Sequence, residues 1–162
     1  ESLVGLLQSW SDFASTQNLP WWIAHGALIG WFWNARLLPW DADLDIQVPT
    51  RTLLRLLPHN NTLHAPDARY LLDVNPHVVH RSPQTNNTID ARWIDTWTGY
   101  MIDITGLTQY ASTGRMHCKT PHPYSIAQLM PLHETWVEGV RVWRPRDVVG
   151  ILVEEYGEQS LI

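Results

Sequence analysis

Residues 38–48, LPWDADLDIQV, place aspartates at the alternate positions Asp41, Asp43 and Asp45 of a largely apolar run. With the two-residue period of a β-strand, the aspartates and Gln47 face one way, and positions 40, 42, 44, 46 and 48 face the other. Residues two apart on one face of a strand are about 6.6 Å apart. At an effective dielectric constant of about 20, two such carboxylates repel each other by roughly 2–3 kcal/mol. The stretch therefore predicts a strand with a buried apolar face and an acidic face that needs a compensating charge.

A divalent cation is the compensating charge that these residue types favour. Two carboxylates that Asp-x-Asp directs to one side suit Mg²⁺ or Mn²⁺, because these ions prefer oxygen ligands and bridge to substrate phosphates. A calcium-binding EF-hand loop beginning at Asp41 is excluded: its sixth position would be glycine and its twelfth glutamate, whereas the sequence has Ile46 and Thr52. The alternative is a sheet edge that faces solvent, where acidic residues oppose aggregation.

Two other segments point to the same chemistry. Residues 24–30, AHGALIG, predict the end of a strand, a turn at Gly26 and the start of a helix, whose backbone N–H groups favour phosphate. Tight packing is the alternative reason for Gly26 and Gly30. Asp103, in YMIDITG (100–106), is an acid inside a predicted strand and needs a partner or a metal ion. We expect it to complete the ion site or to act as a general base; the alternative is an aspartate that pairs with Arg92 or caps a loop.

The composition fits one folded domain and excludes several classes of protein. The chain has 162 residues, 44% of them hydrophobic, which suits one domain with a sizeable core. A net charge of −5 without a Lys/Arg stripe argues against a nucleic-acid partner. The single cysteine, Cys118, excludes an intrachain disulfide framework, and no second pair joins it and His122 into a zinc site. Neither a Walker loop nor a serine nucleophile elbow occurs.

Membrane and secretory signals are few. The apolar segment 19–33, whose only titratable residue is His25, has about 15 residues, fewer than the roughly 20 that span a bilayer. We interpret it as buried core. Two N-x-T sequons, at Asn60 and Asn86, favour the secretory pathway. The chain begins inside an amphipathic pattern, so we expect it to be a domain excised from a longer chain.

Apolar periodicity and turn residues predict an α+β fold. Helices are expected over 3–14, 27–35 and 50–57, with Thr50 as the N-cap of the third, and from Pro145 to Gly157. Strands are expected at 21–25, within 38–48, at 69–74 and 77–81, and in two hairpins within 88–107 and 134–143. Residues 108–125 are expected to be irregular. Asp90 and Asp95 are predicted to have structural roles.

The longest of these motifs carries a family resemblance. Residues 21–48, WWIAHGALIGWFWNARLLPWDADLDIQV, resemble the LicD/fukutin family, most of all its fungal members. The segments NPHVVHRS (75–82), IDARWIDTWTGYMIDIT (89–105) and PLHETWVEGVRVWRPRDVVGILVEEYGEQSL (131–161) resemble the same branch. The resemblance covers nearly the whole chain. It implies a single domain over residues 1–162 with a nucleotidyltransferase-like mixed sheet flanked by helices.

The resemblance also implies an activity and its residues. Such enzymes are metal-dependent phosphotransferases, which move a phospho-alcohol or sugar phosphate from a nucleotide-linked donor, CDP- or GDP-linked, to a glycan or glycoprotein acceptor. The implied cofactor is Mg²⁺ or Mn²⁺, bound by Asp41, Asp43 and Asp45, and the implied catalytic residues are Asp43, Asp45 and Asp103. The residues expected at the donor phosphates are His25, Gly26, Ala27, Gly30 and Arg36. Family members usually have Thr or Ser at position 27, so Ala27 removes one phosphate hydrogen bond, worth about 1.5–3 kcal/mol.

Fungal relatives imply mannosylphosphate addition to cell-wall glycans in the Golgi lumen. We therefore expect the secretory pathway, with membrane attachment only through an anchor outside this chain. Two alternatives stay open. One is a non-catalytic module that keeps the fold and serves as a regulator or partner of a glycosyltransferase. The other is nucleotide transfer onto a protein or small molecule. Arg36, Arg92 and Lys119 are further candidate phosphate contacts, with a surface or pairing role as the alternative.

Overall fold

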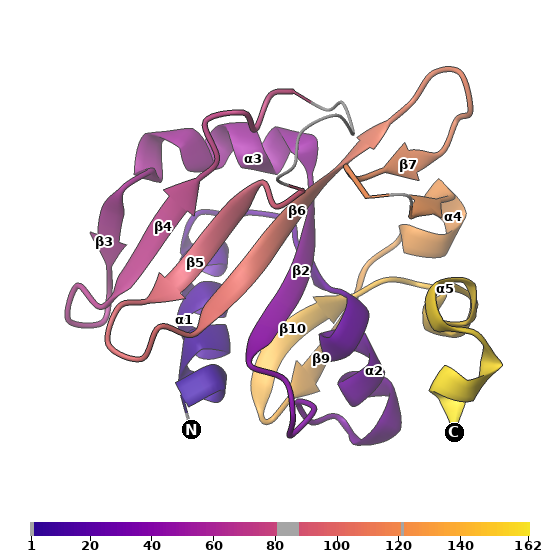
Figure 1. Cartoon of the computed structure of the whole chain (residues 1–162), viewed down its shortest axis with the longest axis horizontal. Helices are drawn as coiled ribbons and strands as arrows, with labels where there is room; N and C mark the ends of the chain where they lie inside the picture. The colour runs from indigo at the N-terminus through magenta and orange to yellow at the C-terminus, as the bar shows by residue number, and fades with distance from the viewer. Residues whose placement is uncertain (1, 81–87, 121) are drawn as a thin grey trace.

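A mixed β-sheet runs through the centre of the molecule, with helices on its faces and at one end (Figure 1). The computed structural model describes residues 2–80, 88–120 and 122–162, so the sequon at Asn86 lies outside the described residues. Within them the strand order is β1-β2-β6-β5-β4-β3, and β7 and β8 extend the sheet from β6. The strands are β1 (Trp22–Ile23), β2 (Asp43–Pro49), β3 (Thr62–His64), β4 (Tyr70–Val74), β5 (Ala91–Asp95), β6 (Met101–Gln109), β7 (Met116–His117) and β8 (Pro123–Tyr124).

The helices follow the chain around this sheet. They are α1 (Ser2–Thr16), α2 (His25–Asn34), α3 (Thr50–Leu56), α4 (Ile126–Leu129) and α5 (Val148–Tyr156), with 3₁₀ turns η1 (Leu57–His59) and η2 (Glu158–Leu161). α2 and α5 pack against each other beside β2 (Figure 1). A separate hairpin, β9 (His133–Val137) and β10 (Val140–Arg144), contacts α1 and β1. The α+β class predicted from the sequence is therefore confirmed.

Strand register decides which side chains share a face of the sheet. β2 and β6 are parallel, with Leu44 opposite Ile102 and Asp45 opposite Asp103. The antiparallel strand β5 then places Trp93 opposite Ile102 and Arg92 opposite Asp103. Because opposite residues point to the same side, one face of the sheet is apolar at these positions and the other is charged.

Helix α1 covers the apolar face. The ring centroids of Trp10 on α1 and Trp93 on β5 are 5.7 Å apart, in an edge-on arrangement. Trp10, Trp21 and Trp22 are almost fully buried, which confirms that the apolar segment 19–33 contributes to the core. In the part of the chain that the structure describes, no helix is both long enough and apolar enough to cross a membrane.

The acidic strand begins later than its alternation predicts. A turn closed by the Asp41 N–H and the Leu38 carbonyl precedes it, and strand pairing starts at Asp43, opposite Met101. Trp40 is therefore 68% exposed rather than buried with Leu44. Gln47 is only 2% exposed, so the face of the strand that carries the aspartates is buried at this position.

Several predicted elements have different bounds. His25 starts α2 instead of ending a strand, and Pro49, not Thr50, is the N-cap of α3. Residues 77–80 form turns instead of the predicted strand, because the Asn75 side chain accepts a hydrogen bond from the His77 N–H and Pro76 interrupts pairing; residue 81 lies outside the described residues. The structure adds strand β3, and two short strands and α4 within or beside the segment predicted to be irregular.

Candidate functional site

Carboxylates from two parallel strands and the preceding turn converge on the charged face of the sheet. Asp45 lies directly opposite Asp103, and Asp43 is two residues before Asp45 on the same side of β2. Burial and, to a smaller extent, the charges of Asp43, Asp103 and Asp41 together raise the pKa of Asp45 to about 6, although the His25 charge opposes this shift. The four predicted acidic residues are thus within electrostatic reach of one another.

Asp103 has a partner within this acidic cluster. The Arg92 Nε donates a hydrogen bond to Asp103 Oδ1 at 2.9 Å, and the Asp103 side chain is 14% exposed. The pairing alternative from the sequence is therefore confirmed for one carboxylate oxygen. Because Asp103 also faces Asp45, the ion pair brings an arginine, a group suited to phosphate, to the edge of the acidic cluster.

Asp41 lies against the first turn of α2. A Cβ added at Gly26 would be 2.6 Å from Asp41 Oδ2, so a larger residue at this position would displace the carboxylate from its place. Burial and the charge of Asp43 raise the pKa of Asp41. The helix N-terminus, where backbone N–H groups attract anions, thus faces a carboxylate of the protein itself.

The other residues expected at donor phosphates fall into two groups. His25, Gly26 and Ala27 form the first turn of α2, next to the acidic cluster. Gly30 is in the middle of the helix, where a Cβ would lie 2.3 Å from the Arg36 carbonyl oxygen, so its place is fixed by packing. Arg36 follows the C-cap of α2 and is exposed, at the opposite end of the helix from His25.

A buried polar network, absent from the sequence predictions, holds His25. His25 Nδ1 is 2.8 Å from Glu155 Oε2 on α5, and the Tyr124 hydroxyl donates to Glu155 Oε1. Gln47 Nε2 donates to the Tyr124 hydroxyl at 3.1 Å, and Trp22 Nε1 donates to Gln47 Oε1 at 3.0 Å. The network joins β1, β2, β8 and α5 to the start of α2.

This network sets the charge beside Asp45. Burial alone would lower the pKa of His25, but the hydrogen bond and charge of Glu155 and the charge of Asp45 raise it overall. Burial opposes ionisation of Glu155, yet the contacts with His25 and Tyr124 lower its pKa. His25 also has φ 48°, a left-handed conformation that a side chain other than glycine rarely adopts. When His25 is protonated, it forms an ion pair with Glu155 next to the aspartates.

Glu155→Gln is expected to lower the pKa of His25, because it removes the carboxylate charge that offsets the effect of burial. An NMR titration of the His25 imidazole measures this change. A His25 pKa that is higher in the folded than in the unfolded state stabilises the fold at pH values below it, and this stabilisation is lost as the pH rises through the folded-state pKa. The free energy of unfolding of the variant is therefore expected to depend less on pH. Glu154→Gln, on the same helix and 53% exposed, is the matched control. An unchanged His25 pKa in Glu155→Gln would contradict the assigned network.

Trp40, which directly precedes Asp41 in the sequence, packs against Trp33 near the end of α2. Trp33 and Trp40 are 43% and 68% exposed, with ring centroids 6.4 Å apart. Burial, together with the charges of Glu155, Asp45 and Asp41, raises the pKa of Tyr156 to about 12, which places its hydroxyl near the cluster. The His122 ring centroid is 5.4 Å from that of His25.

Lys119 and two other aspartates stabilise the fold instead of contributing to this site. Lys119 Nζ is 2.9 Å from Asp90 Oδ1, and the two side chains are 1% and 0% exposed. Asp90 Oδ2 also accepts from the Gly106 N–H at 2.8 Å. Asp95 accepts from Arg69 Nε at 2.7 Å and from the Thr98 hydroxyl at 2.8 Å. The predicted structural roles of Asp90 and Asp95 are confirmed, and Lys119 has the pairing role.

The donor set fits a hard cation that also binds phosphate. Within residues 2–80, 88–120 and 122–162, no three His, Cys, Asp or Glu side chains are already arranged to hold a metal ion. Mg²⁺ commonly uses one or two carboxylates and completes its shell with water and substrate phosphates. Asp43 and Asp45 meet that requirement, and a bound cation would offset both causes that raise the pKa of Asp45, its burial and the charges of the neighbouring carboxylates.

The fold and the site together define a class of protein. A solved structure of a lincosamide antibiotic adenylyltransferase, LnuA, bound to lincomycin, superposes with a TM-score of 0.52 over 93% of this chain and 88% of that chain, at 11% identity. The fold is therefore the predicted nucleotidyltransferase-like mixed sheet flanked by helices. Residues 18–147 match the family described as LicD/FKTN/FKRP, nucleotidyltransferase domain, and the chain belongs to this family.

Two yeast proteins are similar in sequence. Mannosyltransferase regulator 4 of Saccharomyces cerevisiae (strain ATCC 204508 / S288c) is 35% identical over 120 residues, which are 70% of this chain and 10% of that protein. Mannosyltransferase regulator 14 of the same organism is 34% identical over 124 residues, 71% of this chain and 13% of that protein. These similarities support the fungal branch of the family, and the chain spans only a small part of the relatives' length.

Proposed function

We propose that the chain is the transferase domain of a protein that acts in glycosylation, a metal-dependent phosphotransferase that moves a phospho-alcohol or sugar phosphate from a CDP- or GDP-linked donor to a glycan. The observation that carries this proposal is the register that places Asp45 beside Asp103 on parallel strands, with Asp43 on the same side. Carboxylates in this arrangement, next to a helix N-terminus and an arginine, suit a donor with a charged diphosphate.

The side chains then have separate roles. Mg²⁺ or Mn²⁺, held by Asp43 and Asp45 with Asp41 nearby, would neutralise charge on the donor diphosphate. Arg92 binds a phosphate oxygen of the donor while it holds Asp103 in place. The acceptor hydroxyl oxygen attacks the phosphorus that carries the transferred group, Asp103 accepts the hydroxyl proton, and the bond from that phosphorus to the nucleoside monophosphate breaks. His25, fixed by Glu155, supplies positive charge beside Asp45.

The proposal also covers the surroundings of the reaction. We propose a glycan or glycoprotein acceptor, a place in the secretory pathway within the Golgi lumen, and a membrane anchor supplied by a segment outside this chain. The sequon at Asn60 and the yeast relatives, which are named as mannosyltransferase regulators, support the secretory assignment. No role for nucleic acid is proposed, because the net charge of −5 opposes it.

A regulatory module of a glycosyltransferase is the second candidate function. Both yeast relatives are named as regulators. Two local features favour it as well: Ala27 has no hydroxyl for a phosphate, and the Asp41 carboxylate lies against Gly26 at the helix N-terminus. In a regulator these two features would weaken the transfer reaction, while the domain would still fold and bind a donor together with the metal ion.

Asp43→Asn is expected to abolish metal-dependent donor binding without loss of the fold, because Asp43 is exposed and its carboxylate is a proposed ligand of the ion. Thermal unfolding with Mn²⁺ and CDP-, GDP- or UDP-linked donors, each repeated with EDTA, measures the effect. At a donor concentration of 100 times Kd the wild type gains about 2.7 kcal/mol. Asp12→Asn, an exposed aspartate on α1, keeps the gain.

Three outcomes of this experiment separate the candidates. Equal stabilisation of the wild type and Asp43→Asn by a donor would contradict the metal site. Donor binding without transfer to any glycan would favour the regulatory module. Labelled nucleoside monophosphate attached to the acceptor would replace phosphotransfer with nucleotide transfer.

A further inference from the structure

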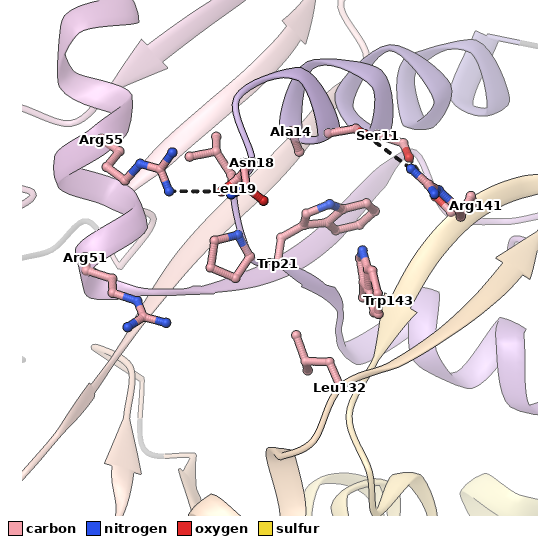
Figure 2. A pocket seen from close by; sticks show the side chains of 12 residues that line it. Ser11, Ala14, Asn18, Leu19, Trp21, Arg51, Arg55, Leu132, Arg141 and Trp143 are labelled. Carbon is pink, nitrogen blue, oxygen red and sulfur yellow. Dashed lines mark hydrogen bonds between the residues drawn. The ribbon is translucent and has the colours of Figure 1, made fainter.

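A cavity lies on the other face of the sheet from the acidic cluster. Its volume is about 500 Å³, within the range of small-molecule sites. The cavity is formed by the end of α1, the segment before β1, the start of α3 and the strand β10 (Figure 2). Since α1 covers the face of Trp93 and Ile102, while Asp45 and Asp103 point to the opposite face, the sheet separates the two sites.

Positive charge gathers at this cavity in a protein whose net charge is −5. Arg51, Arg55 and Arg141 all line it, and no acidic residue is among the described residues of its wall. Figure 2 shows Arg51 and Arg55 on one side of the cavity, and Arg141 on the other. An electrostatic site of this kind attracts an anion.

The arginines are held to different degrees. Arg55 donates to the carbonyl oxygens of Asn18 and Gln17, at 2.9 and 2.5 Å, and so caps the end of α1. Arg141 donates to the Ser15 hydroxyl at 3.2 Å, and its other terminal nitrogen is 3.7 Å from Glu134. Arg51 is exposed, and the described part of the chain gives its guanidinium no hydrogen bond or ion pair. Arg51 is therefore the arginine that is available to a ligand.

The rest of the wall is suited to a sugar ring. Trp143 on β10 lines the cavity and is partly exposed, whereas Trp21, before β1, is only 2% exposed (Figure 2). An indole face offers a flat apolar surface to the C–H groups of a pyranose. Ser15 and Asn18 add polar groups beside it, which can bind sugar hydroxyls.

We propose that this cavity binds a sugar that carries a phosphate group, with the phosphate at Arg51 and the ring against Trp143. Arginine binds phosphate through charge-assisted, often bidentate hydrogen bonds, which a solvated lysine matches less well. The site is independent of the proposed phosphotransfer, because it shares no residue with the acidic cluster and needs no metal ion.

Calorimetric titration of the full chain with glucose 6-phosphate in EDTA and low salt tests the site. We expect binding that weakens as NaCl is raised, and at least a tenfold higher Kd in Arg51→Glu, because the variant loses a charge-assisted contact and gains a repulsive charge. Arg146→Glu makes the same charge change at an exposed position after β10 and is expected to retain the wild-type Kd. Glucose and inorganic phosphate, each titrated alone, are expected to bind more weakly than the sugar phosphate.

Several results would overturn this site. Binding that is equal in Arg51→Glu and the wild type would exclude Arg51 as the phosphate contact. Equal losses in Arg51→Glu and Arg146→Glu would show a general charge effect. Inorganic phosphate that binds as tightly as glucose 6-phosphate would exclude a contact between the sugar ring and Trp143. Because EDTA removes metal ions, failure of the acidic cluster as a donor site would leave these results unchanged.

Discussion

Asp45→Asn is expected to stabilise the metal-free protein at neutral pH and, at the same time, to abolish metal-dependent donor binding. In the wild type the Asp45 carboxyl must ionise among Asp41, Asp43 and Asp103 in a half-buried position, which raises its pKa from 3.8 to about 6. A difference of this size corresponds to about 3 kcal/mol before solvent screening, and partial exposure reduces the expected gain to about 1–2 kcal/mol. Asparagine has no charge to bury and cannot replace the carboxylate as a metal ligand.

The pH dependence gives this prediction a definite sign. An acid whose folded pKa lies above its unfolded value binds protons more readily in the folded state, so folding stability falls as the pH rises from 3.8 to about 6. The stability difference between Asp45→Asn and the wild type therefore grows across that window and is constant above it. Urea unfolding in EDTA at a series of pH values measures it. Asp12→Asn is the control, and an Asp45→Asn variant less stable than the wild type at neutral pH would contradict the repulsion.

Lys119→Met is expected to destabilise the protein by about 3–5 kcal/mol, because it removes the cation that faces Asp90 and leaves the carboxylate charge in the interior. Both side chains are buried, at 1% and 0% exposure, and their charged atoms are 2.9 Å apart. Chemical denaturation with linear extrapolation measures the loss. Methionine has a similar length, so lost packing volume contributes little.

A double variant separates the charge from the packing. Lys119→Met combined with Asp90→Asn removes both charges of this ion pair, and the asparagine offers an amide oxygen as an acceptor for the Gly106 N–H. We expect the double variant to be more stable than Lys119→Met alone. A loss of less than about 1 kcal/mol in the single variant, the size of an exposed pair, would show that the ion pair is solvated.

The acidic strand and its partner were predictable because their side chains alternate. Asp43, Asp45 and Asp103 each interrupt an apolar strand, and a charge in such a place needs a partner whatever the tertiary structure. Trp40 fits the same alternation but lies outside the strand, in a turn closed by a hydrogen bond from the Asp41 N–H to the Leu38 carbonyl. The alternation of apolar and polar side chains does not reveal such a backbone hydrogen bond. The strand predicted at 77–81 is wrong over 77–80 for a similar reason: a local hydrogen bond, from the His77 N–H to the Asn75 side chain, forms a turn there.

The residues around His25 could not be predicted from local patterns. Glu155 is 130 positions from His25 along the chain. It lies near the end of α5, after the apolar residues of that helix, and the sequence does not indicate whether its side chain is buried. Tyr124 belongs to a two-residue strand, too short to produce a periodic signal. Only the packing of α5 beside α2 brings these groups together. Long-range polar networks of this kind depend on tertiary geometry, whereas an alternating strand depends on sequence alone.

The parallel pairing of β2 and β6 has a consequence for the order of folding. Parallel strands need a long connection, and here the connection contains α3, β3, β4 and β5. The hairpin β5–β6 closes a short loop, whereas Asp45 meets Asp103 only after the much longer loop is closed, at a larger entropic cost. A nascent chain that has not yet completed β6 therefore lacks the pairing of Asp45 with Asp103. Any ligand that bridges the two strands stabilises the whole sheet, and we expect it to slow amide hydrogen exchange across all of β2, β5 and β6 rather than at the contacted residues alone.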